Sequence, residues 1–349
     1  MSLTVPKFER RNRRLGAWVL ALLWVMATAA GLAAGSEGFA WPQGWGSDEG
    51  LRTILFEIRL PRTLGAGLVG ALLGLAGAIA QGLFRNPLAD PYLLGTAAGS
   101  SVAVVAVLAA TSMVSAQGSS GVDTAVSGSV HVLADVGIVV AAFAGALLGM
   151  ALTLSLARGA RHTPRLLLAG VVVGVMLMAV GDLLTSAFPE ALRARQGFLL
   201  GSTAYLGWAS VGWLAAGLLV ALPLAWRISR VLDALALGDD GALSLGLDLG
   251  RLRLVFVGLL ALATGLAVSQ AGLVAFVGLV APHIVRRSVT ASHGVVLVAS
   301  AATGGVLLLV ADLVARTVAA PQELPVGVLT AVIGGGYLLR LLQRRGGRS

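Results

Sequence analysis

Two arginines stand at the mouth of a long apolar segment. The stretch FEIRLPR (56–62) places Arg59 and Arg62 three residues apart, just before an apolar run that begins at Thr63. A guanidinium presents a planar fork of N–H donors, which suits paired hydrogen bonds to a carboxylate. Arginine beside membrane spans usually lies on the cytoplasmic side. The side of the membrane on which these two arginines lie therefore decides which partners they can bind.

Three further ionisable residues fall inside apolar runs. They are Asp182, Asp312 and Arg316. A charge at the centre of a bilayer costs at least ~2.5–3.5 kcal/mol, so such residues are functional candidates by default. Asp312 and Arg316 are four residues apart, which is the spacing of an ion pair on one helix face. Asp182 lies near the end of its run and can reach the interface. An ion-driven carrier usually has acids near the midplane, so this scarcity argues against one.

The sequence lacks the groups that most enzymes need. Lys7 is the only lysine, so there is no G-x-x-x-x-G-K-[ST] phosphate loop, and ATP energy must come from another subunit. There is no cysteine and no nucleophile motif. The four histidines are scattered without metal-ligand spacing; they are His131, His162, His283 and His293. We therefore expect a protein that is not an enzyme and has no cofactor and no metal site.

Composition identifies the environment of these residues. The 349 residues are 57% hydrophobic and 12% charged, with a mean hydropathy of +0.90, which is typical of an integral membrane protein. The net charge of +9 comes mainly from residues that flank apolar runs, so it indicates orientation in the membrane and no nucleic-acid partner. Glycine is abundant, and pairs such as Gly70/Gly74, Gly145/Gly149 and Gly170/Gly174 predict faces where helices approach closely.

The apolar runs predict about ten transmembrane helices in an all-α polytopic protein. Arg251–Val285 is too long for one span, because a single helix of that length would be ~52 Å long against a ~30 Å core. We expect it to form two short spans with a turn at Ser269–Gly272. The eight clear spans are Leu15–Ala34, Thr63–Phe84, Tyr92–Ser115, Ala134–Leu156, Leu166–Phe188, Tyr205–Trp226, Val295–Ala315 and Val326–Leu342.

The distribution of basic residues predicts the orientation. With ten spans, all but six of the 25 lysines and arginines fall on one side, which the positive-inside rule makes cytoplasmic. Both termini are then cytoplasmic, and we expect the first run to be a retained span, since it is longer than the core of a signal peptide. The six arginines predicted to lie outside are Arg52, Arg59, Arg62, Arg193, Arg195 and Arg316.

Three segments outside the spans have distinct compositions. Residues 35–58 are rich in tryptophan, glycine and acids and predict an external loop. Residues 116–133 predict a flexible external loop. Residues 228–250 predict one or two short cytoplasmic helices, because apolar residues recur there at helical spacing between glycines. The chain is otherwise expected to be a single transmembrane domain over residues 1–349.

Several motifs, in order along nearly the whole chain, resemble the FecCD family. This family comprises permease subunits of bacterial ABC importers for iron-siderophores, haem and cobalamin. The motifs are RLPR (59–62), QGLFRNPLADPYLLG (81–95), RLLLAG (165–170), ALALGDDGALSLG (234–246), AGLVAFVGLVAPHIVRR (271–287), ADLVAR (311–316) and ELPVGVLTAVIGG (323–335).

The resemblance implies a type II ABC importer permease fold in the bacterial cytoplasmic (inner) membrane. It also implies partners: a second permease copy in a homodimer, ATP-binding ABC subunits inside, and a periplasmic or lipid-anchored substrate-binding protein outside. Alternating access would occur at the dimer interface within the lipid bilayer. The implied cargo is a metal chelate, with a ferric siderophore expected first and haem or cobalamin next. The alternative is an ion-coupled secondary transporter.

The resemblance also assigns roles to residues. Docking of the binding protein falls to Arg59, Arg62 and Arg316, and Glu57 could compete for the first two. The inner gate and pathway fall to Thr163, Pro164, Arg165, Gly174, Met178 and Asp182. Coupling to the ATPase falls to Leu235, Ala236, Leu237, Gly238, Asp239, Asp240, Ala242 and Gly246.

Overall fold

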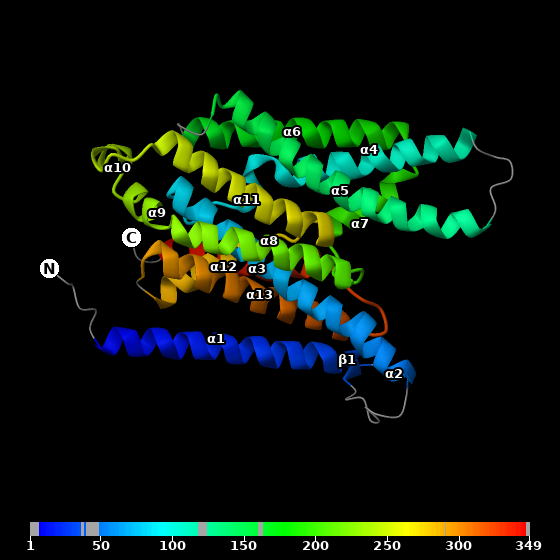
Figure 1. The fold of residues 1–349 in the computed structure, drawn as a ribbon, viewed down its shortest axis with the longest axis horizontal. Coiled ribbons are helices and arrows are strands. Elements are labelled where there is room, and N and C mark those ends of the chain that lie inside the picture. The colour runs from blue at the N-terminus through cyan, green and yellow to red at the C-terminus, as the bar shows by residue number, and fades with distance from the viewer. Residues whose placement is uncertain are drawn as a thin grey trace.

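The computed structural model describes residues 7–35, 38–39, 49–117, 124–159, 163–289 and 291–346. These residues form a bundle of long helices with short helices at both ends (Figure 1). The long or apolar helices are α1 (Lys7–Ala33), α3 (Leu60–Phe84), α4 (Thr96–Gln117), α5 (Thr124–Leu156), α6 (Thr163–Ala187), α8 (Trp208–Arg227), α11 (Leu249–Ala271), α12 (Val277–Ser288), α13 (His293–Thr317) and α14 (Val326–Gly346).

Short elements connect the long helices. They are the two-residue antiparallel strands β1 (Ala34–Gly35) and β2 (Gly38–Phe39), α2 (Glu49–Thr53), the π-helix η1 (Ile54–Arg59), the 3-10 helix η2 (Pro91–Leu94), α7 (Ala191–Leu200), α9 (Arg230–Leu235) and α10 (Asp239–Ser244). Figure 1 places α9 and α10 at one end of the bundle, and α2 and β1 at the other.

Within the described residues, seven helices are long and apolar enough to cross a membrane, and two shorter apolar helices accompany them. The predicted break in the run 251–285 is present, because α11 ends at Ala271 and α12 begins at Val277. At 1.5 Å per residue the 12 residues of α12 extend ~18 Å, which is shorter than the ~30 Å hydrocarbon core.

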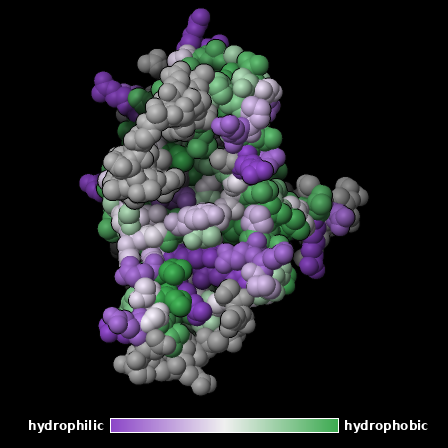
Figure 2. Space-filling view, turned by 90° about the vertical axis from the view of Figure 1, so that its right-hand side faces the viewer, coloured by the Kyte–Doolittle hydropathy of each residue, from purple (hydrophilic) through white to green (hydrophobic). Residues whose placement is uncertain are grey.

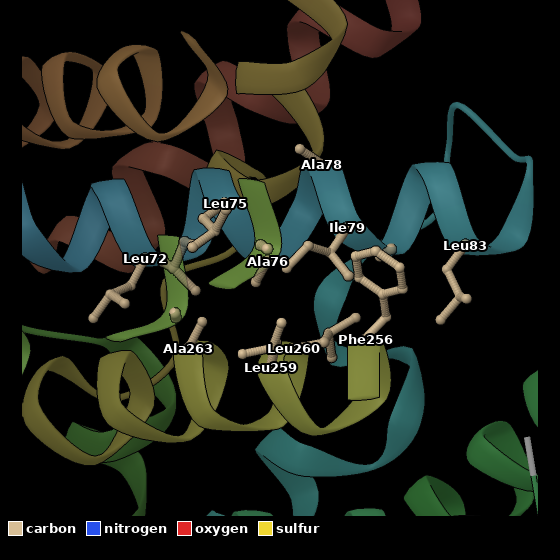
Figure 3. Close-up of a cluster of buried hydrophobic side chains, with 14 of the residues drawn as sticks. Leu72, Leu75, Ala76, Ala78, Ile79, Leu83, Phe256, Leu259, Leu260 and Ala263 are labelled. Carbon is tan, nitrogen blue, oxygen red and sulfur yellow. The ribbon is translucent and has the colours of Figure 1, made fainter. Parts of the chain in front are cut away.

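The helix α3 occupies the centre of the bundle. In its most apolar 18-residue stretch 89% of the residues are buried, against 6% in that of α1. Leucine, isoleucine and alanine side chains of α3 pack against Phe256, Leu260 and neighbouring residues of α11 (Figure 3). Most exposed apolar side chains lie on α1, α5, α6 and α8, and lipid can solvate them.

Glycine lets α3 approach its neighbours. A Cβ atom at Gly70 or Gly74 would collide with the backbone oxygen of Gly304 or Ser300 on α13. The predicted face of Gly145 and Gly149 is likewise packed against α4. Of the third predicted pair, Gly170 is packed against the backbone of Leu93, whereas a Cβ atom at Gly174 would meet no other atom within 4 Å, so the close approach expected at Gly174 is not made within this chain.

Two predicted loops are partly helical. The expected external loop 35–58 includes α2 and η1, so the arginine stretch FEIRLPR continues directly into α3 as one helical segment. The expected loop 116–133 is shortened in the same way, because α4 continues to Gln117 and α5 begins at Thr124. Residues 118–123 lie outside the described residues.

Candidate functional site

A buried cluster of charges joins α3 and α13 at the end of the bundle that carries α2. The Nε and Nη2 atoms of Arg62 donate to Oδ1 of Asp312 at 3.3 and 3.2 Å. Its Nη1 atom donates to Glu323 at 2.8 Å. Arg316 donates to the second oxygen of Asp312, so the predicted pair across one helical turn is present. Thr203 also donates to Asp312, at 2.5 Å.

Three members of the cluster are buried, with exposed fractions of 8% for Arg62, 1% for Asp312 and 4% for Arg316. Glu323 lies at its exposed edge. Two arginines are matched by two carboxylates, which is the arrangement that makes buried charge tolerable. Viewed from this end, hydrophilic side chains form a band between apolar regions (Figure 2).

Arg59 is held differently. It is half-buried, and its Nη1 atom donates to the carbonyl oxygen of Leu32 at the end of α1, at 3.0 Å. Glu57 is exposed, and it is not among the contacts of Arg59 and Arg62 in the described part of the chain. Of the three predicted docking arginines, Arg59 alone thus keeps a charge that no described carboxylate contacts.

The second candidate site lies at the opposite end, where α9 and α10 form the two short helices predicted from periodicity. Leu235 and Ala242 are fully buried and pack this segment against the bundle. Ala236, Leu237, Asp240 and Gly246 are exposed, and Gly238 and Asp239 are partly exposed. Leu243 and Leu245 lie in the predicted segment but were not among the residues assigned to coupling; they are 56% and 62% exposed and give this end an apolar surface.

Asp239 and Asp233 tie this segment to the long helices. Oδ1 of Asp239 accepts from Nη2 of Arg253 at 2.8 Å and from Nη2 of Arg85 at 3.2 Å. Oδ1 of Asp233 accepts from the backbone N–H of His293 at 3.0 Å, and Nδ1 of the same histidine lies 2.7 Å away. No sequence motif could have connected these residues, because the partners are 14 to more than 150 positions apart.

The third group of predicted residues lies on α6. Thr163, Pro164 and Arg165 form its first turn and are partly or fully exposed, while Arg161 and His162 lie outside the described residues. Met178 is 54% exposed, and Asp182 is exposed beside it, one turn further along. These positions share a largely exposed helix that the rest of this chain does not cover.

Asp182 has a partner that the sequence analysis did not propose. Its Oδ1 atom lies 2.6 Å from Nη1 of Arg195 on α7. The pair lines a cavity of about 130 Å³ together with Ser101, Met178, Phe198 and neighbouring residues. The Arg195 guanidinium packs beside Gly181 of α6. The arrangement offers one polar contact point in an otherwise apolar surface.

None of these groups forms a metal-binding cluster. Among the described residues, no three histidine, aspartate or glutamate side chains lie close enough together to hold an ion. The buried charge cluster is suited to recognition by charge, and the α9–α10 end is suited to binding a partner through apolar side chains. The exposed face of α6 is suited to lining a mostly apolar path.

Comparison with known proteins places this geometry in context. Residues 19–344 match the model of the FecCD transport family. The chain is 38% identical over 343 residues to the "Vitamin B12 import system permease protein BtuC" of Salmonella paratyphi A, covering 96% of both chains. It is 36% identical over 309 residues to the "Cobalamin import system permease protein BtuC" of Halobacterium salinarum, covering 88% of this chain and 78% of the relative.

A solved structure shows the same fold. It is described as an inward-facing conformation of a metal-chelate type ABC transporter, with a TM-score of 0.80 and 27% sequence identity. The similarity covers 94% of this chain and 98% of the solved chain.

Proposed function

Because the chain belongs to the FecCD transport family, we propose that it is the permease subunit of an ATP-driven importer that carries cobalamin. The family match, the similar permeases and the long apolar helices identify it as a multi-pass membrane protein and a component of a transporter. Cobalamin is proposed as the cargo because the chain is 38% identical to a vitamin B12 permease over 96% of both chains. The sequence alone had placed ferric siderophores first, and this relationship moves cobalamin ahead of them.

The proposed partners follow from the two ends of the bundle. An ATPase subunit would seat on the apolar surface formed by Leu237, Leu243 and Leu245, which are all more than half exposed. A substrate-binding protein would dock at the opposite end, where Arg59, Arg62 and Arg316 gather. A carboxylate of the docking protein would meet Arg59 first, since Arg62 and Arg316 already contact Asp312.

The pathway is proposed to lie along α6, between this chain and a second copy. Gly174 faces open space and Met178 and Asp182 are exposed, which is the arrangement expected of a surface that contacts a passing cargo. The Asp182–Arg195 pair would offer hydrogen bonds to the amide groups of a cobalamin. Mostly apolar walls would bind it weakly, which favours release over retention.

The test is uptake by the reconstituted complex. The permease, its ATPase and its binding protein are placed in proteoliposomes, and uptake of radiolabelled cyanocobalamin and of a ferric siderophore is measured with and without ATP. We expect ATP-dependent accumulation of cobalamin. Accumulation of the siderophore alone would refute cobalamin as the cargo. Uptake that persists without nucleotide and follows an ion gradient would instead identify an ion-coupled secondary transporter.

A further inference from the structure

One carboxylate oxygen joins the short helix α10 to two long helices. Oδ1 of Asp239 accepts from Arg85, which directly follows α3, and from Arg253, which lies in the first turns of α11. The Arg253 side chain is 2% exposed, so this bond is anchored within the bundle, whereas Arg85 and Asp239 are 41% and 42% exposed. Any displacement of α10 must therefore displace or break contacts with α3 and α11.

Arg85 combines an unfavourable backbone conformation with the ion pair to Asp239. This residue ends α3 with a φ of +50°, in the left-handed region. Glycine is the usual residue there, because a Cβ atom disfavours this conformation. The arginine at this position pairs with Asp239, so the strained backbone and the ion pair belong to the same residue.

The neighbouring short helix α9 holds a different helix. Asp233 accepts from the backbone N–H and lies beside the ring of His293, the first residue of α13. A carboxylate at the amino end of a helix satisfies one of its unpaired N–H groups and interacts favourably with its dipole. The segment 228–250 is thereby bound to the near ends of both α3 and α13.

Helices α3 and α13 behave as one packed unit. They lie side by side and antiparallel (Figure 1), and glycines at their interface bring their backbones into direct contact. Their far ends carry Arg62 on α3 and Asp312 and Arg316 on α13, which form the buried charge cluster. The same two helices thus connect the coupling segment at one end with the predicted docking arginines at the other.

We infer that the α3–α13 pair transmits the effect of binding-protein docking to the coupling segment, and that Asp239 is the positioning residue that attaches the segment to this pair. The inference rests on the proposed function. Close packing without side-chain slack favours movement of the pair as a rigid unit. Coupling between two binding sites is reciprocal. If docking of the binding protein shifts α10, binding of the ATPase to α10 must in turn change the affinity for the binding protein.

Asp248 provides a control outside the residues assigned to ATPase coupling. It is exposed, caps the start of α11 close to α10, and pairs with Arg251 of the same helix end. Asparagine at this position removes one negative charge from the same end of the molecule and can still cap the helix. Only Asp239→Asn weakens the bonds to Arg85 and Arg253. A difference between Asp239→Asn and Asp248→Asn therefore reports on the connection and not on surface charge.

The experiment measures ATP hydrolysis in nanodiscs that contain the full complex, with and without the binding protein. We expect complexes of Asp239→Asn that retain the ATPase subunit to lose about fivefold or more of the stimulation by the binding protein, expressed relative to the variant's own basal rate; this is the low end of common allosteric couplings. Asp248→Asn should be stimulated as strongly as the unmodified permease. Equal stimulation in both variants would overturn the inference, and so would loss of the ATPase subunit from Asp239→Asn alone, since that shows a local seating role.

Arg85→Gly separates transmission from folding. Glycine relieves the left-handed backbone, so this variant should melt at the same or a higher temperature, yet it should lose stimulation as Asp239→Asn does. Full stimulation in Arg85→Gly would overturn the role of the α3 connection. Failure of the unmodified permease to bind any ATPase would instead refute the proposed function, and the two failures are thus distinguishable.

Discussion

At the scale of single residues, the three predicted docking arginines differ in what already holds them. Arg62 and Arg316 are buried with Asp312, and their removal would leave an unpaired charge in the interior. Arg59 bonds to a backbone carbonyl at the end of α1 and is half-buried. Arg59 is therefore the residue at which a docking contact can be tested without first damaging the fold.

Reversing the charge of Arg59 should weaken docking. We expect Arg59→Glu to reduce the affinity of the nanodisc-embedded permease for its binding protein about tenfold, which corresponds to ~1.4 kcal/mol. The loss should shrink as salt increases. Biolayer interferometry at low and high salt measures both effects.

The control is Arg52→Glu, which reverses an exposed charge in α2 at the same end of the molecule. It should change the affinity far less than Arg59→Glu does. An equal loss in both variants would mean that the binding protein responds to the overall positive charge at this end of the permease and makes no specific contact with Arg59.

Asp90 gives a prediction for pH. Its carboxylate accepts from the backbone N–H of Tyr92 at 2.8 Å and caps η2. Burial raises the pKa of Asp90 from 3.8 to about 6, and the bond from Tyr92 opposes this only in part. Between these values the folded protein keeps a proton that the unfolded chain has released, so this stabilising contribution is lost as the pH rises through about 6.

Asp90→Asn should remove that dependence, because the amide keeps an acceptor oxygen and does not ionise. Melting temperatures in detergent at pH 5 and pH 7.5 provide the measurement. The unmodified protein should lose more stability than the variant over this interval. A variant with the same or a steeper decline would show that other groups dominate the response.

At the scale of helices, the contact between α3 and α13 depends on the absence of side chains. A methyl group at Gly74 would collide with the carbonyl oxygen of Ser300, and backbone cannot move aside as a flexible side chain can. We expect Gly74→Ala to destabilise the protein by about 1–3 kcal/mol, the usual range for overpacking. Urea or thermal unfolding of the purified protein checks the value.

Gly258 on α11 is the matched control. A Cβ atom there meets no other atom within 4 Å. Gly258→Ala should leave the protein unchanged or stabilise it by up to about 1 kcal/mol, because alanine is the better helix former. If Gly74→Ala is as mild as Gly258→Ala, the two helices are less tightly joined than their geometry indicates.

The helices themselves were largely predictable, because hydrophobic length is a local property of the sequence. The break between α11 and α12 was found from length alone. The helical character of residues 49–59 was missed, since their charged residues and the glycines and tryptophans just before them suggest a loop. The i,i+4 pair of Asp312 and Arg316 was likewise visible from spacing.

The contacts across long sequence separations were not predictable. Arg62 and Asp312 are 250 positions apart, and no pattern within either helix identifies the other. The same holds for Arg85 and Asp239. Such pairs depend on which helices become neighbours, and that is decided by packing faces distributed over the whole chain.

At the scale of the whole molecule, the exposed apolar side of α6 bears on assembly. Val175 on α6 and Leu219 on α8 are 63% and 74% exposed, so exposure alone does not distinguish them. Val175 is three residues before Met178 and seven before Asp182, which puts it on the same helix face. The proposed pathway along α6 therefore predicts that Val175 faces a second copy and that Leu219 faces lipid. Because the sequence contains no cysteine, a single cysteine can be placed at either position without background.

We therefore expect Val175→Cys, treated with a bifunctional maleimide, to yield a crosslinked dimer on a denaturing gel. Leu219→Cys should remain monomeric under the same conditions. Efficient crosslinking at Leu219 with none at Val175 would assign the dimer contact to the opposite side of the chain.

The buried charge cluster also bears on the order in which the chain can fold while it is being synthesised. Helix α3 is made early in translation, but Asp312 and Glu323, which neutralise Arg62, are made only after roughly nine tenths of the chain. Until then the Arg62 guanidinium has neither carboxylate partner, and an unpaired charge close to lipid is costly. We therefore expect a chain that is truncated before α13 to be degraded faster in cells than the full-length chain, which a pulse-chase comparison of the two would measure.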